Sequence, residues 1–290
     1  MKKPEMRDVK GDGIRIHIAE WKGDGPPVVM IHGLTANCMC WDVLAESLGE
    51  DHHLIAPDLR GRGRSDHPQS GYSVENHAGD VLALLDDMEL AGSEKKPGPI
   101  LMGHSLGAVI ALAVAAKKPE AVSKIILLDG GGILSPEETR AVVLSILPSL
   151  ERLGKIYPSF EALMDEMKKM SALSSIPEEI EAYFRYDVEE TQGGVRSVIR
   201  KETIDEEFSN LQKTDVADYY GKVKAPVLIV RAMKGIVNEG AVFVPQNALN
   251  RMLSEMNCAE FIDIPDANHY TIIFKLFPEL SETVRDFIRR

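Results

Sequence analysis

The sequence predicts an α/β fold in which a doubly wound, mostly parallel sheet of eight strands carries an inserted helical segment. Short and almost wholly apolar runs, such as residues 28–31 and 124–128, are typical of strands buried on both faces of a parallel sheet. Segments with helical periodicity alternate with these runs. The chain has 290 residues, which suits one such domain with an insertion.

The eight strands and their helices follow in chain order. Residues 5–21 predict a hairpin of two antiparallel edge strands, because isoleucines alternate with other residues after a Gly-Asp-Gly turn. The other strands are expected at 28–31, 53–56, the run before Gly103, 124–128, 226–230 and 260–264. Helices are expected near 41–48, 74–90, 106–117, 246–256 and 274–288.

Residues 133–220 break this alternation. Leucine and methionine recur there at spacings of three and four, interrupted by Pro148, Pro158 and Pro177, and no strand-like run occurs. We expect a helical insertion that forms a cap over the carboxyl edge of the sheet, where ligands bind in open α/β folds. The predicted organisation is a core of residues 1–132 and 221–290 with a cap at 133–220.

Composition and charge exclude several classes of protein. The net charge of -12 argues against a nucleic-acid partner, and no apolar stretch reaches the ~20 residues of a membrane span. Polar residues follow the first lysines in place of an apolar export signal. Cys38, Cys40 and Cys258 form neither a sensible disulfide set nor a metal cluster. We therefore expect a cytoplasmic protein with a small-molecule substrate and without metal or cofactor.

The sequence Gly103-His104-Ser105-Leu106-Gly107 joins the apolar run before it to an alanine-rich helix. Ser105 would occupy a sharp strand-to-helix turn, and a Cβ at either glycine would clash where the helix passes the strand. The turn aims the N–H of Leu106 and the positive helix end at an oxygen that becomes negative. The stretch thus predicts Ser105 as a nucleophile.

A serine nucleophile needs an oriented base, and His269 is the candidate. His269 follows the strand expected at 260–264 through a short loop, which places it at the edge of the sheet where Ser105 lies. The side chain of His104 is expected to point away from the site. His32 is expected to pack beside the oxyanion loop.

Several motifs together resemble the α/β-hydrolase superfamily, in its capped esterase-like branch. They are His32-Gly33, the Asp58 to Ser65 loop, Gly103–Gly107, Leu127-Leu128-Asp129 and Asn268-His269-Tyr270, and they span nearly the whole chain in the family's order. The resemblance implies that the loop from Asp58 to Ser65 is structural. This superfamily hosts many chemistries, so the substrate has to be argued separately.

An oxyanion hole would use the backbone N–H groups of Leu34 and Leu106. The acid that orients His269 departs from the commonest family pattern, since residues 231–237 contain no carboxylate. Two substitutes are Glu239 and Asp129, and some members of the superfamily place their acid at the position of Asp129, 24 residues after the nucleophile. The glycines that follow Asp129 leave its carboxylate uncrowded, which favours Asp129 and keeps Glu239 as the alternative.

These residues predict a metal-free serine hydrolase that cleaves a small or medium ester or lactone through an acyl-enzyme. The same residues would serve a carbon–carbon bond or thioester hydrolase, an acyltransferase, or a ligand-sensing protein with slow hydrolysis. We expect His32, Phe160, Met164 and Tyr270 beside the substrate. A cap rich in leucine and methionine suggests an apolar pocket.

Overall fold

The computed structural model of the chain describes residues 3–49, 51–93, 95–169, 178–236 and 241–290. An eight-stranded sheet lies at its centre, in the order β1-β2-β4-β3-β5-β6-β9-β10. Its strands are β1 (Glu5–Lys10), β2 (Arg15–Trp21), β3 (Pro27–Ile31), β4 (His53–Pro57), β5 (Ile100–His104), β6 (Lys124–Leu128), β9 (Val227–Lys234) and β10 (Ala259–Asn268). In this sheet order, every neighbouring pair from β4 through β3, β5, β6 and β9 to β10 is parallel. This confirms the predicted fold class.

The predicted hairpin of residues 5–21 is present, but only one of its strands lies at the edge of the sheet. β2 pairs antiparallel with β1 on one side and with β4 on the other. The expectation of two edge strands was therefore wrong for β2. Its burial explains the difference, since Ile18, Ala19, Glu20 and Trp21 are all buried as in an inner strand.

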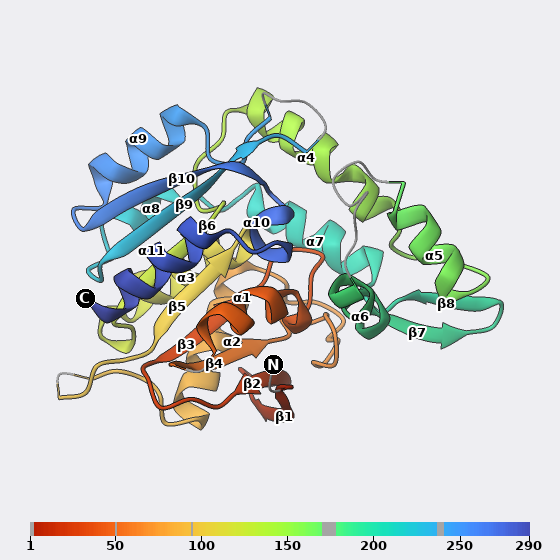
Figure 1. Ribbon diagram of the computed structural model, residues 1–290, viewed down its shortest axis with the longest axis horizontal. Coiled ribbons are helices and arrows are strands. Elements are labelled where there is room, and N and C mark those ends of the chain that lie inside the picture. Colours follow the sequence, from red (N-terminus) through yellow and green to blue (C-terminus); the bar gives the residue numbers. More distant parts are fainter. Residues whose placement is uncertain (1–2, 50, 94, 170–177, 237–240) are drawn as a thin grey trace.

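Helices cover both faces of the sheet, because the inner strands carry apolar side chains that are buried on both faces. Val28 and Met30 of β3 pack into one apolar cluster, while Val29 and Ile31 pack into another on the opposite face. The first cluster includes α1, α10 and α11, and the second includes α2, α3 and α9 (Figure 1). Their bounds are α1 (Asp42–Leu48), α2 (Val74–Asp87), α3 (Leu106–Lys117), α9 (Gln246–Glu255), α10 (Thr271–Phe274) and α11 (Pro278–Arg289).

The end of the chain differs from prediction in two places. A single closing helix was expected at 274–288, but α10 and α11 are separate and Pro278 begins the second. A proline fits the first turn of a helix and cannot continue one from before, which explains the break. β10 also runs on to Asn268, through a change of register after Ile264, so that residues 265–268 belong to the strand.

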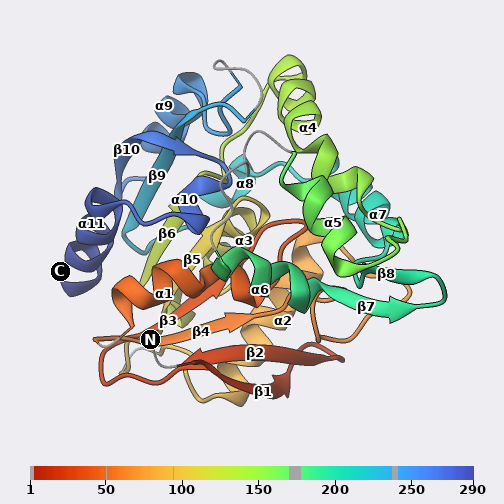
Figure 2. The same ribbon diagram turned by 45° about the vertical axis from the view of Figure 1, so that its right-hand side comes forward.

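Residues 133–220, which we name the inserted segment, lie between β6 and β9. The segment contains α4 (Pro136–Glu151), α5 (Phe160–Met167), α6 (Glu178–Asp187), β7 (Val188–Thr191), β8 (Gly194–Ser197), α7 (Lys201–Leu211) and α8 (Ala217–Tyr220). Figures 1 and 2 show α4, α5, α7 and the β7–β8 hairpin on the side of the molecule away from α9 and α11.

The hairpin contradicts the expectation that the inserted segment has no strand. Each strand has only four residues, too few for an alternating pattern to stand out. The turn is the better signal, because Gly193 and Gly194 both adopt positive φ, at 100° and 139°. Pro148 lies inside α4 rather than interrupting it, and Pro177 is outside the described residues.

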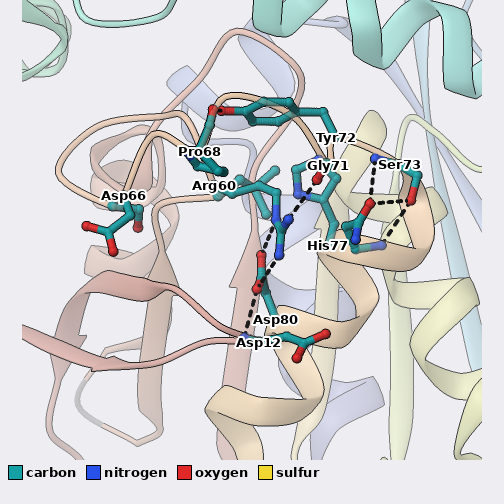
Figure 3. Close-up of polar contacts among 12 residues, drawn as sticks. Asp12, Arg60, Asp66, Pro68, Gly71, Tyr72, Ser73, His77 and Asp80 are labelled. Atoms are coloured by element: carbon teal, nitrogen blue, oxygen red, sulfur yellow. Dashed lines mark hydrogen bonds and ion pairs between the residues drawn. The ribbon is translucent and has the colours of Figure 1, made fainter.

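The loop from Asp58 to Tyr72 is fixed by a buried ion pair (Figure 3). Arg60 donates from Nε and Nη2 to both carboxylate oxygens of Asp80 in α2, at 2.7 and 2.8 Å, and from Nη1 to the carbonyl of Gly71 at 2.7 Å. Asp80 Oδ1 also accepts the N–H of Asp12, at 2.9 Å. The glycine- and arginine-rich sequence of this loop thus serves the fold, as the family resemblance implies.

Candidate active site

Ser105 lies in a strained turn between β5 and α3. Its backbone has φ 55° and ψ −117°, a conformation that is costly for any residue with a side chain. The flanking glycines are required by close approach: a Cβ on Gly107 would lie 2.0 Å from the carbonyl oxygen of Ile31, and one on Gly103 would lie 2.1 Å from that of Gly107. The turn lifts Ser105 to the carboxyl edge of the sheet.

His269 and Asp129 are brought together at the same edge. His269 follows β10, and its Nδ1 lies 2.8 Å from Oδ2 of Asp129, which follows β6. Asp129 has a positive φ of 47°, and its other carboxylate oxygen accepts the N–H of Ala232 at 3.1 Å. The alternative acid, Glu239, lies outside the described residues.

Burial sets the protonation of this pair. It lowers the pKa of His269 to about 3, because an imidazolium ion is poorly solvated there, and it raises the pKa of Asp129. The imidazole is therefore neutral at pH 7. Since Nδ1 faces the carboxylate, Nδ1 carries the proton and Nε2 keeps its lone pair.

Two residues that hold His269 were missed by the sequence prediction. The ring of Phe243 stacks on that of His269, with centroids 3.3 Å apart and planes at 7°. His104, which was expected to point away, donates from Nε2 to the carbonyl oxygen of His269 at 2.9 Å. Its ring lies 4.5 Å from that of His269 and faces the same cavity. Burial lowers the pKa of His104 to about 3 and keeps it neutral.

The loop after β3 lies directly against Ser105. A Cβ on Gly33 would be 3.2 Å from Cβ of Ser105. The carbonyl of Gly33 accepts hydrogen bonds from His32 Nδ1, at 2.8 Å, and from the N–H of Ala36, at 3.2 Å. Because a trans peptide is planar, these bonds also fix the N–H of Leu34, which points to the opposite side.

His32 therefore supports the loop after β3 from below and does not face the pocket. Its Nε2 accepts the N–H of Leu59 at 3.0 Å, so the proton must reside on Nδ1. Burial lowers the pKa of His32 to about 3, which is consistent with a neutral ring. The side chain is fully buried and does not line the cavity, contrary to the prediction.

A buried arginine connects the loop after β3 to the inserted segment. Arg62 Nε donates to the carbonyl oxygen of Leu34 at 3.1 Å. Its Nη2 forms an ion pair with Glu207 of α7, whose other oxygen lies 2.7 Å from Nε2 of His77. All three side chains of this cluster are 0–1% exposed.

A cavity of about 60 Å³ lies over Ser105 and His269, and side chains of the inserted segment form part of its wall. Tyr270, which we expect beside the substrate, lines the cavity. Phe160 and Met164 do not, because the apolar face of α5 packs into the core cluster and only Met167, one turn further on, reaches the cavity. Among the residues that the structure describes, the cavity is lined by Gly33, Leu34, Thr35, Ala36, His104, Ser105, Ile146, Ser149, Arg152, Met167, Tyr183, Phe184, His269, Tyr270, Ile273 and Phe274.

No helix among the described residues is long and apolar enough to cross a membrane. Within the same residues, no group of three or more histidine, cysteine, aspartate or glutamate side chains could hold a metal ion.

Comparison with known proteins identifies the class. A family model for the alpha/beta hydrolase fold matches residues 26–276, and the chain belongs to that family. Over 282 residues it is 26% identical to 2-(acetamidomethylene)succinate hydrolase of Mesorhizobium japonicum, covering 95% of this chain and 92% of that relative. A crystal structure of E-2-(acetamidomethylene)succinate hydrolase is similar with a TM-score of 0.83 and 25% identity, over 99% of this chain and 100% of the other.

A further relative matches a smaller part of the chain. The chain is 28% identical to 2-hydroxymuconate semialdehyde hydrolase of a Pseudomonas species over 183 residues, which is 60% of this chain and 62% of that protein. Family membership thus supports a hydrolase, while the relatives act on different compounds.

Proposed function

We propose that the protein is a serine hydrolase of the carboxylesterase type, which cleaves a small ester or lactone through an acyl-enzyme. The observation that carries the proposal is the 2.8 Å contact between His269 Nδ1 and Asp129 Oδ2, made beside a cavity that His269 shares with the strained Ser105. A nucleophile, a neutral base and an orienting carboxylate are the three parts that such chemistry requires.

Each step follows from the site. Ser105 Oγ attacks the carbonyl carbon while Nε2 of His269 takes its proton, and Asp129 stabilises the imidazolium ion. The N–H groups of Leu34 and Leu106 hydrogen-bond the oxyanion, and the latter belongs to the first residue of α3, which has no partner within the helix. His269 then protonates the leaving alcohol, and a water molecule activated by the same base releases the acid.

We also propose that the inserted segment, residues 133–220, acts as a cap over a core of residues 1–132 and 221–290. The support is that α4, α5 and α6 all contribute side chains to the wall of the cavity above Ser105. A closed cap excludes bulk water and completes the binding site.

Labelling with a fluorophosphonate, read by intact mass, tests the proposal. The wild-type protein should gain one adduct, Ser105→Ala should gain none, and Ser254→Ala, a change at an exposed serine of α9, should label like wild type. Folded protein without any adduct would contradict the hydrolase assignment. Turnover of a panel of esters of rising acyl length and of lactones then separates an enzyme from a ligand-sensing protein, which would be labelled but turn over none.

A further inference from the structure

A buried arginine forms part of the cavity wall. Arg152, at the end of α4, is 3% exposed and lines the cavity together with Ser105 and His269. Much of the remaining wall is apolar, with Ile146, Met167, Phe184, Ile273 and Phe274 among its members. A guanidinium ion in such surroundings is costly unless it is paired and hydrogen-bonded.

The contacts of Arg152 leave part of its guanidinium unused. Nη1 forms an ion pair with Asp187, and Nη2 donates to the carbonyl oxygen of Thr35 at 2.9 Å. A guanidinium has five N–H donors in a planar fork. These two bonds leave three donors without an acceptor among the residues that the structure describes.

Two hydroxyl groups lie on the same wall. Ser149 is one helical turn before Arg152 on α4, and its Oγ lies 2.7 Å from the hydroxyl of Tyr270, the residue after His269. Both side chains line the cavity. Hydroxyl hydrogens rotate, so either group can donate to a ligand oxygen. Arg152, Ser149 and Tyr270 thus form a polar patch that the acyl chemistry at Ser105 does not use.

We propose that this patch binds a carboxylate of the substrate, so that the enzyme prefers small acyl compounds that carry a free carboxylate in addition to the scissile bond. The planar fork of Arg152 matches a carboxylate in two-point hydrogen bonding, and the hydrogen-bonded hydroxyls of Ser149 and Tyr270 together offer one further donor. The ion pair with Asp187 already balances the charge of Arg152. The patch therefore favours a singly charged carboxylate over a doubly charged phosphate. A cavity of about 60 Å³ favours a short acyl chain.

This inference rests on the proposed hydrolase, and a matched pair of esters tests it separately. Monomethyl succinate carries a carboxylate, whereas methyl levulinate has a neutral acetyl group of similar shape in its place. The wild-type enzyme should show kcat/KM about 100-fold higher for monomethyl succinate, because hydrogen bonds between a guanidinium and a carboxylate are much stronger than those to a neutral carbonyl oxygen. Methanol release measures both rates.

The variant must remove the binding of the substrate carboxylate without leaving a buried charge unpaired, because Asp187 without Arg152 would destabilise the fold. The double variant Arg152→Gln/Asp187→Asn meets this condition and should bring the ratio of the two kcat/KM values close to one. The ratio is independent of the folded fraction and of any general loss of rate from the freed Thr35 carbonyl. Arg185→Gln, a change at an exposed arginine of α6 paired with Glu181, is the matched control and should keep the wild-type ratio.

Three outcomes would overturn the carboxylate assignment: a wild-type ratio near one, a ratio unchanged in the double variant, or no turnover of either ester by protein whose Ser105 is labelled by the fluorophosphonate. In each case labelling reports a reactive Ser105, and turnover of the panel of esters and lactones tests the hydrolase assignment separately. Loss of labelling in wild-type protein, in contrast, contradicts the hydrolase proposal on which the inference rests.

Discussion

Replacing Asp129 by asparagine changes few atoms but should reverse the tautomer of the proposed base. One oxygen of Asp129 accepts the N–H of Ala232 and the other faces Nδ1 of His269. In Asp129→Asn the amide oxygen keeps the bond to Ala232, because only an acceptor fits there. The NH2 group then faces His269, which must accept at Nδ1 and carry its proton on Nε2. A ring in this tautomer has no lone pair for the proton of Ser105.

The expected cost is up to ~10⁴-fold in kcat, the loss known for this change in serine protease triads, or roughly 5 kcal/mol in activation free energy. Folding should be preserved, because burial raises the pKa of Asp129 and its ionised form is itself unfavourable in the folded protein. Steady-state kinetics on an ester, with Tm measured beside them, check both parts. Asp266→Asn, a change at an exposed residue of β10 paired with Lys234, is the matched control and should leave kcat unchanged.

A kcat of Asp129→Asn within tenfold of wild type would contradict the assignment of Asp129 as the orienting acid. A loss of ~10⁴-fold in Glu239→Gln at unchanged Tm, with Asp129→Asn nearly normal, would assign the acid to Glu239 instead.

Two further predictions concern the pH profile and the turn at Ser105. Catalysis needs neutral His269 beside ionised Asp129. Burial lowers the pKa of His269 to about 3 but raises the pKa of Asp129 to about 7, so kcat/KM should fall as the pH drops through about 7 and the pair takes up a proton. A pH–rate profile that stays level from pH 8 to pH 5 would contradict this, provided that circular dichroism shows folded protein throughout. Gly107→Ala would place a Cβ 2.0 Å from the carbonyl oxygen of Ile31, so we expect Tm to fall by more than about 10 °C in a thermal melt. A stable Gly107→Ala protein would show that α3 can move away from β3.

The sequence was informative where function requires a local pattern. The turn at Ser105 needs two glycines, a strand before it and a helix after it, and all of these are visible in one stretch. His269 could be placed because it follows a strand whose end must lie at the same edge. Asp129 could only be ranked above Glu239, because the choice depends on contacts between segments 140 residues apart.

Other parts of the site depend on tertiary packing and left no local signal. The direction of the His104 side chain is set by the end of β10, and Phe243 is recognised only by its contact with His269. In the sequence, Arg152 resembles any charged residue at the end of a helix. Only the folded structure shows its contacts with Asp187 of α6 and with Thr35 in the loop after β3. The β7–β8 hairpin was not predicted, because strands of four residues are too short to show a clear alternating pattern.

The guanidinium of Arg62 links the position of the loop after β3 to the position of α7. It is a rigid plane, so the edge that binds the carbonyl of Leu34 cannot stay in place while the edge that binds Glu207 moves away. Displacing α7 would leave Arg62 as a buried charge without its partner, which costs about 3–5 kcal/mol, and would disturb the loop beside Ser105. On the proposed mechanism, compounds that bind only while α7 is displaced would be cleaved slowly, because the N–H of Leu34 would be out of place.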